Sequence, residues 1–339
     1  MLDPLQLADL DEFRAALLTW YRQKRRDLPW RRTQDPYAIW LSEIMLQQTR
    51  VAAVIAHYQR FLQRFPTVHS LAAARESSVL AQWSGLGYYR RARNLHAAAK
   101  AVVRDHGGAF PRTSAGLRAL PGIGRYTAAA IASIAFDEAS AVVDGNVERV
   151  ISRLSKSTVS GKRIWEIAAQ LLACERPGEF NQAMMELGAM VCLPAEPNCP
   201  GCPIRSFCRT QGRHHASRKA PPQVKREIAY ALARDGNSVR LIQRGANQPL
   251  MPGMWELPQV AVTRSPDLLF SVRHSITVTD FTVRVLSCAG ELEGTWIKNS
   301  RLASLPLTGL TKKILRRAAI IKEPVSYRKV SARLGQASR

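Results

Sequence analysis

Acidic residues are scarce in this sequence compared with basic ones. The 339 residues include 26 Asp and Glu against 49 Lys and Arg, which gives a formal net charge of +23 at pH 7 and a pI near 10.6. Such an excess of positive charge is typical of proteins that bind polyanions. Charge alone does not distinguish DNA from RNA or from an anionic membrane, so other features must decide.

Long apolar runs are also missing. No stretch reaches the roughly 18 apolar residues that a membrane span needs. The first residues, Met-Leu-Asp-Pro-Leu-Gln, lack the charged and apolar regions of a signal peptide. With 46% hydrophobic and 22% charged residues, the composition is ordinary for a globular protein of two or three domains. We therefore expect no membrane partner and a cytoplasm-like compartment.

Cysteine is sparse but clustered. Four of the six cysteines fall within 17 residues with the spacing C-x6-C-x2-C-x5-C, which favours a metal centre over disulfides. The spacing leaves a structural zinc ion and a cubane iron–sulfur cluster equally open. We expect Cys174 and Cys288 to be small buried hydrophobes. The four candidate metal ligands are Cys192, Cys199, Cys202 and Cys208.

The pattern of apolar residues divides the chain into two parts. Up to about residue 210 the periodicity is helical, whereas later segments alternate as strands do. The expected fold class is a mainly α N-terminal region (1–210) plus a C-terminal α+β domain (227–320), joined by a basic, proline-containing linker (211–226) and followed by a basic tail (321–339). We predict strands at 227–233, 239–243, 275–287 and 294–297. The basic residues Lys312, Lys313, Arg316 and Arg317 are interpreted as the solvated face of a helix.

A glycine hairpin followed by a lone acid is the most informative local pattern. Residues 120–131 read Leu-Pro-Gly-Ile-Gly-Arg-Tyr-Thr-Ala-Ala-Ala-Ile, and Asp144 follows in Val-Val-Asp-Gly-Asn-Val. Gly122 and Gly124 allow close backbone approach before a helix amino terminus, which suits a DNA phosphate. Each fragment alone is more often an ordinary Pro-Gly turn or a helix cap. Their combination favours a site that grips the DNA backbone.

A second acid, Glu43, is placed on an apolar helix face by its sequence neighbours. Residues three and four positions away include Ile39, Trp40 and Leu46. Desolvation there would raise the pKa of the carboxyl and keep a proton available near neutral pH. A charged residue at the edge of a core helix is the alternative that this segment alone favours.

Several segments together resemble the adenine DNA glycosylases (MutY family). The resemblance implies the helix-hairpin-helix glycosylase fold, a [4Fe–4S] cluster in the loop 192–208, and removal of adenine mispaired with 8-oxoguanine (OG) or guanine in double-stranded DNA. We expect a monomer that associates with the nucleoid through DNA. Besides the hairpin and the cysteines, the matching segments are RRDLPW (25–30), WLSE (40–43), MLQQT (45–49), WSGLGYY (83–89), VDGN (143–146) and FNQAMMELGA (180–189).

The resemblance also implies roles for individual residues. Glu43 would protonate the adenine and activate water, Asp144 would stabilise the sugar cation, and Tyr126 would assist by hydrogen bonding. The similar endonuclease III family has lysine where this chain has Tyr126, so no Schiff base forms and we expect a monofunctional glycosylase that leaves an abasic site. Residues expected around the flipped base are Arg26, Leu28, Trp30, Leu46 and Glu186, and those beside the opposite guanine are Gln48, Thr49, Leu86 and Tyr88.

The C-terminal domain resembles the family's Nudix-like domain more weakly, through residues 250–258. It lacks the acidic helix with which Nudix hydrolases bind magnesium, so recognition is implied instead of hydrolysis. The family's lesion-reading loop usually contains Phe-Ser-His, but here only His274-Ser275-Ile276 aligns, with Ser275 as the candidate contact. Two other functions stay open: a thymine glycosylase for G·T mismatches and a catalytically silent iron–sulfur DNA-binding protein.

Overall fold

The computed structural model describes residues 7–155, 159–211, 223–262, 267–276, 278–288 and 292–322. The chain forms two compact units, each of which combines distant parts of the sequence. Unit 1 contains 1–48, 67–69 and 97–219, and unit 2 contains 49–66, 70–96 and 220–339. Within the described ranges, no helix combines the length and the apolarity that crossing a bilayer requires. The predicted domain boundaries remain a prediction.

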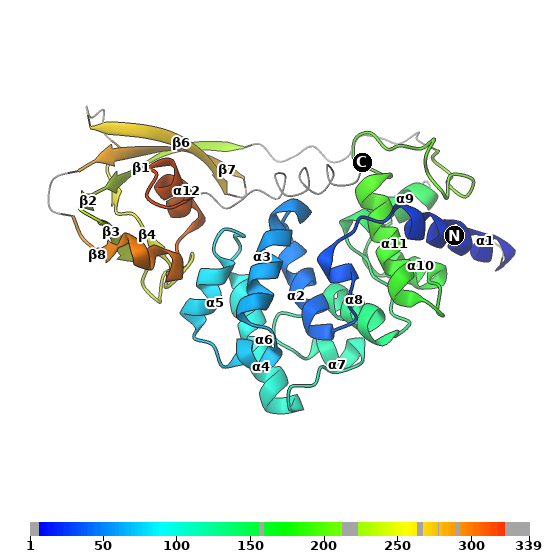
Figure 1. Ribbon diagram of the computed structural model, residues 1–339. Coiled ribbons are helices and arrows are strands. Elements are labelled where there is room, and N and C mark those ends of the chain that lie inside the picture. The colour runs from blue at the N-terminus through cyan, green and yellow to red at the C-terminus, as the bar shows by residue number, and fades with distance from the viewer. Residues whose placement is uncertain are drawn as a thin grey trace, which may run out of the picture. The chain divides into compact units, whose positions relative to one another are not determined.

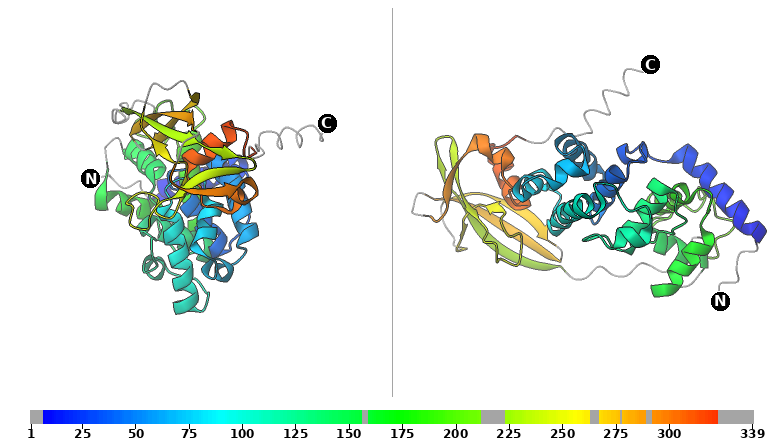
Figure 2. Two further views of the ribbon diagram at one scale, coloured as in Figure 1. Left: turned by 90° about the vertical axis from the view of Figure 1, so that its left-hand side faces the viewer. Right: turned by 90° about the horizontal axis from the view of Figure 1, so that it is seen from below.

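Unit 1 is helical, as the periodicity predicted. Its centre is α11 (Pro177–Met190), which packs against α1 (Leu7–Lys24), α8 (Arg125–Phe136) and α9 (Gly145–Ser155), as Figures 1 and 2 show. The helix α8 also packs against α2 (Pro36–Leu46) and α7 (Ser114–Arg118). The core of this bundle includes Phe13, Leu17, Val150, Phe180 and Leu187, all almost fully buried. The remaining elements are η1 (Pro29–Arg31) and α10 (Gly161–Leu171).

Local sequence explains where α2 begins. Pro36 occupies the first turn, where its missing N–H costs nothing, and the Asp35 side chain accepts a hydrogen bond from the Tyr37 backbone N–H at 3.0 Å. Nine of the following residues are buried, Glu43 among them. A helix that is apolar on most sides must lie inside the domain, so α2 is fixed at the centre of the site described below.

Unit 2 includes helices from the N-terminal half of the chain. They are α3 (Val51–Arg64) and α5 (Glu76–Trp83), whereas α4 (Val68–Ala72) and α6 (Arg90–His106) contribute residues to both units. The fully buried rings of Phe61 and Trp83 meet edge to face, with centroids 6.1 Å apart. The hydroxyls of Ser84 and Tyr89 both donate to the carbonyl of Leu307, so the turn after α5 is tied to the C-terminal domain.

The C-terminal domain is α+β, as predicted. One sheet has the order β5 (Gln259–Val260), β1 (Val224–Leu232), β7 (Thr279–Ser287), β6 (Leu268–Ile276), with β1 and β7 parallel. The second contains β2 (Arg234–Asp235), β3 (Ser238–Gln243), β4 (Trp255–Glu256) and β8 (Thr295–Lys298). Buried residues such as Val239, Leu241, Val283 and Val285 form their core together with α12 (Gly309–Arg317). The element η2 (Asn299–Ser304) precedes α12.

Three expectations from the sequence differ from this structure. The single strand predicted at 275–287 is wrong, because β6 ends at Ile276 and β7 begins at Thr279. The strand β1 begins at Val224, inside the segment predicted as a linker, of which residues 212–222 lie outside the described part, as do residues 323–339 of the predicted tail. Cys174 is exposed in the turn between α10 and α11, so its predicted burial is wrong; Cys288 is half-buried.

Candidate functional site

Glu43 is buried within unit 1, on the face of α2 that its neighbours predicted. Only 6% of its surface is exposed, and the Tyr126 hydroxyl donates to its Oε2 at 2.6 Å. Burial raises the pKa of Glu43 to about 7, and the negative charge of Asp144 acts in the same direction, against the Tyr126 hydrogen bond and the charge of Arg31. This carboxyl therefore exchanges its proton near neutral pH.

Tyr126 lies in the first turn of α8, opposite Glu43. Burial raises its pKa well above the ordinary value of 10, and the nearby charges of Glu43 and Asp144 raise it further. The phenol therefore keeps its proton and acts as a hydrogen-bond donor. The end of α2 is also held to α8, because Gln47 Nε2 donates to Thr127 Oγ1 at 3.2 Å.

Asp144 caps the amino terminus of α9 while lying close enough to Glu43 to affect its pKa. Its Oδ1 accepts from the backbone N–H of Val147 at 2.7 Å, and its Oδ2 accepts from the side chain of Asn146 at 2.9 Å. The cap, which the sequence offered as the alternative to a functional role, is therefore present. Capping fixes the position of the carboxylate and leaves its remaining lone pairs available.

Two residues whose roles the sequence did not reveal hold the segment around Asp144. The buried Asn181 side chain accepts from the Val142 N–H at 3.1 Å and donates to the Ser140 carbonyl at 2.8 Å. Gly188 of α11 lies against Asn146, and a Cβ added there would come within 2.6 Å of the Asn146 Cβ. Both residues stand in a matching segment, but sequence spacing alone does not say what they contact.

Glu186 is buried beneath two guanidinium groups. Its carboxylate accepts from Arg26 Nε and Nη2 at 2.9 and 2.6 Å and from Arg31 Nη1 and Nη2 at 2.8 and 2.7 Å. Although burial opposes ionisation, the hydrogen bonds from Arg31 and Arg26 lower the pKa of Glu186 to about 2. Arg31, which the sequence analysis did not identify, thus links this ion pair to Glu43. Of the other residues expected around a flipped base, Leu28 and Trp30 are buried and Leu46 is half-buried.

The glycine hairpin has the predicted form. Gly122 has φ +73°, in the left-handed region that favours glycine, and Gly124 immediately precedes α8. Both residues are exposed, and a Cβ on Gly124 would meet nothing within 4 Å inside the protein. The amino terminus of α8 is therefore open to an approaching group.

The turn after α5, in unit 2, has a strained backbone. Tyr88 has φ +48° and is half exposed, whereas Leu86 is buried. Arg91 stabilises this turn: its Nη2 donates to the carbonyls of Leu86 and Gly87 at 3.2 and 3.1 Å and to Thr49 Oγ1 at 3.1 Å. Its guanidinium also lies 5.6 Å from the centroid of the Tyr88 ring.

Gln48, at the end of unit 1, has the same unusual backbone. Its φ is +56° and its side chain is exposed. Left-handed conformations of residues other than glycine cost free energy and are found preferentially at functional sites. Two of the four residues predicted beside the opposite guanine, Gln48 and Tyr88, have this property. Ser275, the candidate in the C-terminal domain, is exposed in β6 and donates to Asp280 of β7.

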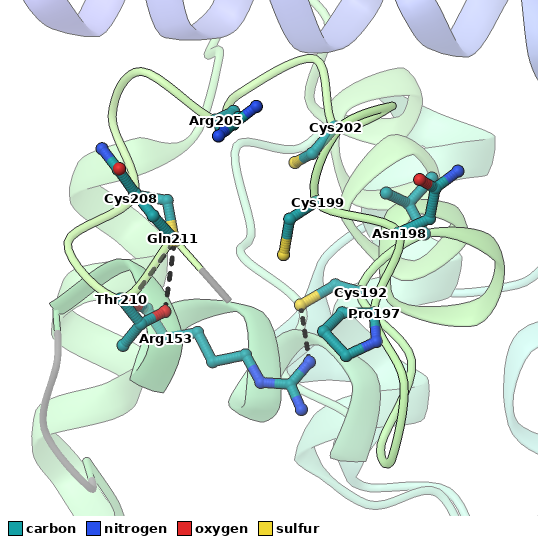
Figure 3. A pocket seen from close by; sticks show the side chains of 11 residues that line it. Arg153, Cys192, Pro197, Asn198, Cys199, Cys202, Arg205, Cys208, Thr210 and Gln211 are labelled. Atoms are coloured by element: carbon teal, nitrogen blue, oxygen red, sulfur yellow. Dashed lines mark hydrogen bonds between the residues drawn. The ribbon is translucent and has the colours of Figure 1, made fainter. Parts of the chain in front are cut away.

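The four clustered cysteines surround one open cavity in unit 1, with about 350 Å³ of empty space including its mouth. Figure 3 shows the sulfur atoms of Cys192, Cys199, Cys202 and Cys208 directed toward this space. Arg153 Nη1 donates to the Cys192 sulfur at 3.1 Å. Burial raises the pKa of Cys202 to about 11, so this thiol is protonated when no metal binds it. Within the described ranges, no group of three or more His, Cys, Asp or Glu side chains forms a site for a single metal ion.

The chain resembles known DNA repair proteins in sequence and in fold. A family described as "HhH-GPD superfamily base excision DNA repair protein" matches residues 41–174. Adenine DNA glycosylase of Rattus norvegicus is 41% identical over 322 residues, covering 76% of this chain and 62% of the relative. The Homo sapiens protein of that name is 49% identical over 222 residues, covering 61% of this chain and 41% of the relative. The chain thus spans less than two thirds of these relatives.

The fold comparison agrees with the sequence comparison. The structure of a thermostable thymine-DNA glycosylase superimposes with a TM-score of 0.58 at 30% identity, covering 62% of this chain and 100% of that one. The sequence match to the family includes the helical region that contains Glu43, Tyr126 and Asp144. The chain therefore belongs to the HhH-GPD superfamily of base excision DNA repair proteins, and within it is similar to the adenine DNA glycosylases named above.

Proposed function

We propose that this chain is a monofunctional DNA glycosylase that removes adenine mispaired with guanine or 8-oxoguanine. The observation that carries the proposal is the arrangement of Glu43, Tyr126 and Asp144. It places a carboxyl with a pKa of about 7 against a neutral phenol, with a second carboxylate close by. Cleavage of a glycosidic bond needs such a pair, in which one group donates a proton and the other stabilises positive charge.

The reaction begins when adenine leaves the base stack, because its glycosidic bond is inaccessible inside the duplex. Protonated Glu43 gives its proton to the adenine ring, so that the bond electrons leave with the base when C1′–N9 breaks. The sugar becomes an oxocarbenium ion, which the Asp144 carboxylate stabilises. Ionised Glu43 then accepts a proton from the water that attacks C1′. The products are free adenine and an abasic site, and Glu43 is again protonated.

Tyr126 sets the limits of this chemistry. Its hydroxyl orients Glu43 and stabilises the carboxylate after proton transfer. A phenol has no amine with which to form a Schiff base, so strand cleavage is not part of the reaction. The pair of Arg26 and Arg31 on Glu186 orders the segment beside this site, next to Leu28 and Trp30.

DNA binding is supported by features of both units. The exposed hairpin at Gly122 and Gly124 presents backbone N–H groups to a phosphate, and Gly124 leaves open space for it. The strained, exposed residues Gln48 and Tyr88 would insert beside the opposite guanine together with Thr49 and Leu86, and the hydrogen bonds of Arg91 hold the turn for that role. In the C-terminal domain, Ser275 would contact the lesion.

The cysteine cavity fits a [4Fe–4S] cluster. Four thiols directed at one space supply the donor set that a cubane needs, with one thiolate on each iron. Among the described residues these thiols do not form a site for one metal ion, which favours the cubane over zinc. Cys192, Cys199, Cys202 and Cys208 would hold the cluster, whose role when bound is to order the loop that carries Arg205 and Arg209.

A thymine glycosylase for G·T mismatches is the second candidate, favoured by the fold match to a thymine-DNA glycosylase. Base release measured in single turnovers on duplexes containing OG·A, G·A, G·T and OG·C separates the two. We expect adenine release from OG·A and G·A only. Thymine release from G·T without adenine release would establish the second candidate, and no release from any duplex would indicate a silent DNA-binding protein.

A further inference from the structure

Four basic side chains of unit 2 lie close enough to interact electrostatically, and two of them contact the backbone of Ser84. His57 and Arg60 lie three residues apart on α3, whereas Lys312 and Arg316 lie four apart on α12, so each pair shares one helix face. Lys312 Nζ donates to the Ser84 carbonyl at 3.0 Å, and the His57 ring hydrogen-bonds the Ser84 backbone. The sequence predicted a solvated helix face for Lys312 and Arg316, and for Lys312 that prediction is wrong.

The positive charges in this cluster repel one another. Burial lowers the pKa of Lys312 to about 8, and the charges of Arg316 and Arg60 act in the same direction. Burial also lowers the pKa values of His57 and Arg60, with smaller contributions from neighbouring cationic groups. A single anion bound among these groups would replace repulsion by attraction.

Within the described ranges, no carboxylate pairs with the cluster. Among the residues that the structure describes, no salt bridge joins His57, Arg60, Lys312 or Arg316 to Asp or Glu. The buried Nε of Arg316 also has no hydrogen-bond partner there. Buried N–H donors of arginine are normally paired, and phosphate oxygens match the fork of a guanidinium.

We propose that Arg60, Lys312 and Arg316 form a binding site for one phosphate of the DNA backbone. The proposal rests on the proposed function, because Ser84 directly precedes the turn that carries Leu86 and Tyr88. A duplex whose mispair contacts this turn must pass backbone phosphates close to Ser84. Since the Ser84 hydroxyl also bonds the Leu307 carbonyl, the C-terminal domain would share this phosphate contact with α3.

Salt dependence of DNA affinity provides the test. Arg60→Ala and Arg316→Ala are compared with Lys313→Ala, a matched control from the exposed side of α12, all in a Glu43→Gln background that prevents turnover. The ligand is a G·A duplex. The plot of log K against log salt has a negative slope, and loss of one phosphate contact makes that slope shallower by about 0.9. Each test variant should therefore bind DNA more weakly than the parent at low salt. The ratio of the two affinities should fall about 3.5-fold between about 50 and 200 mM salt. Lys313→Ala should keep the parental slope.

Several outcomes would overturn the proposal. Parental slopes in both test variants exclude a DNA phosphate at this site. If inorganic phosphate raises the melting temperature of the parent but not of Arg316→Ala, while the slopes stay equal, the site binds a free anion. If a polyglutamate peptide binds only the parent, again with equal slopes, the partner is an acidic protein.

Two controls keep these outcomes separate from other failures. Arg60 lies at the surface with its side chain only partly covered, so Arg60→Ala decides the question even if Arg316→Ala unfolds. With Glu43 restored, the control variant Lys313→Ala should release adenine at the wild-type single-turnover rate at saturating enzyme. If the wild-type chain neither binds the G·A duplex nor releases adenine, the proposed function itself is refuted. Loss of the phosphate site alone would leave both of these activities in the wild-type chain.

Discussion

Glu43→Gln should make the protein more stable while it abolishes adenine release. The folded state raises the pKa of Glu43 from 4.5 to about 7, chiefly by burial. The difference of about 2.5 in pKa corresponds to about 3 kcal/mol at 1.36 kcal/mol for each pKa unit. Wild type loses this free energy when it holds an ionised carboxylate in the folded state.

The sign of the effect fixes the pH at which it is seen. Below pH 4.5 the carboxyl is protonated in both states and costs nothing. Between pH 4.5 and 7 the unfolded chain releases the proton while the folded chain keeps it, so wild-type stability falls as pH rises. The amide that replaces the carboxyl in Glu43→Gln does not titrate and still accepts the Tyr126 hydrogen bond. The variant should therefore gain nothing at pH 4 and up to about 3 kcal/mol at pH 8.

Urea unfolding followed by tryptophan fluorescence at pH 4 and pH 8 measures this difference. Glu179→Gln is the matched control, because the hydrogen bond from Arg22 lowers the pKa of Glu179 and its loss should destabilise slightly at pH 8. Adenine release should be lost in Glu43→Gln alone. If the variant gains no more stability at pH 8 than at pH 4, burial does not raise the pKa of Glu43 and the assignment of the proton donor is refuted.

Other substitutions test the remaining groups. Asp144→Asn should lower the single-turnover rate about 10²–10³-fold because an amide stabilises the sugar cation poorly. The melting temperature of this variant should change little, since Asn also caps helices. A nearly normal rate would mean that another group stabilises the cation. Glu186→Gln should cost about 3 kcal/mol of stability by leaving Arg26 and Arg31 without their buried counter-charge. Wild type loses stability as the pH falls from 4.5 to about 2, and this loss should be absent from the variant. An unchanged urea midpoint would contradict this prediction. Tyr126→Lys should yield borohydride-trappable strand cleavage, and failure to trap a covalent complex would mean that this side chain does not reach the sugar. Purified protein should contain about four irons per chain by elemental analysis; stoichiometric zinc without iron would refute the cluster.

The sequence predicted the environment of Glu43 but not its contacts. Helical spacing correctly placed it among Ile39, Trp40 and Leu46, because burial of a helix face is a local property. The hydrogen bond from Tyr126 joins residues 83 positions apart and depends on how α2 packs on α8. The clamp of Arg31 on Glu186 spans 155 positions, which is why Arg31 was not identified. The periodicity of apolar residues predicts which face of a helix is buried. Contacts between residues far apart in the sequence depend on tertiary packing, which periodicity does not describe.

In the C-terminal domain the local signals themselves were weak. The strands β4 and β5 have two residues each, too few for an alternating pattern. Apolar and β-branched residues continue past Ile276, where β6 ends, and Thr279, where β7 begins. No Gly, Pro or Asn separates the two strands in the sequence, so the pattern predicted one strand. Cys174 was expected inside because cysteine is often buried, yet its place in a turn exposes it.

Because acidic residues are scarce, some buried cationic side chains of this protein bond to backbone carbonyls. Glu186 forms ion pairs with Arg26 and Arg31, whereas Arg91 and Lys312 donate to the carbonyls of Leu86 and Ser84. Carbonyls satisfy hydrogen bonds without cancelling charge, and burial lowers the pKa values of Arg91 to about 10 and Lys312 to about 8. Both groups adjoin the turn that carries Tyr88. A DNA phosphate at the site proposed for Arg60, Lys312 and Arg316 would supply negative charge beside Lys312, so DNA binding would stabilise the contact of Lys312 with Ser84.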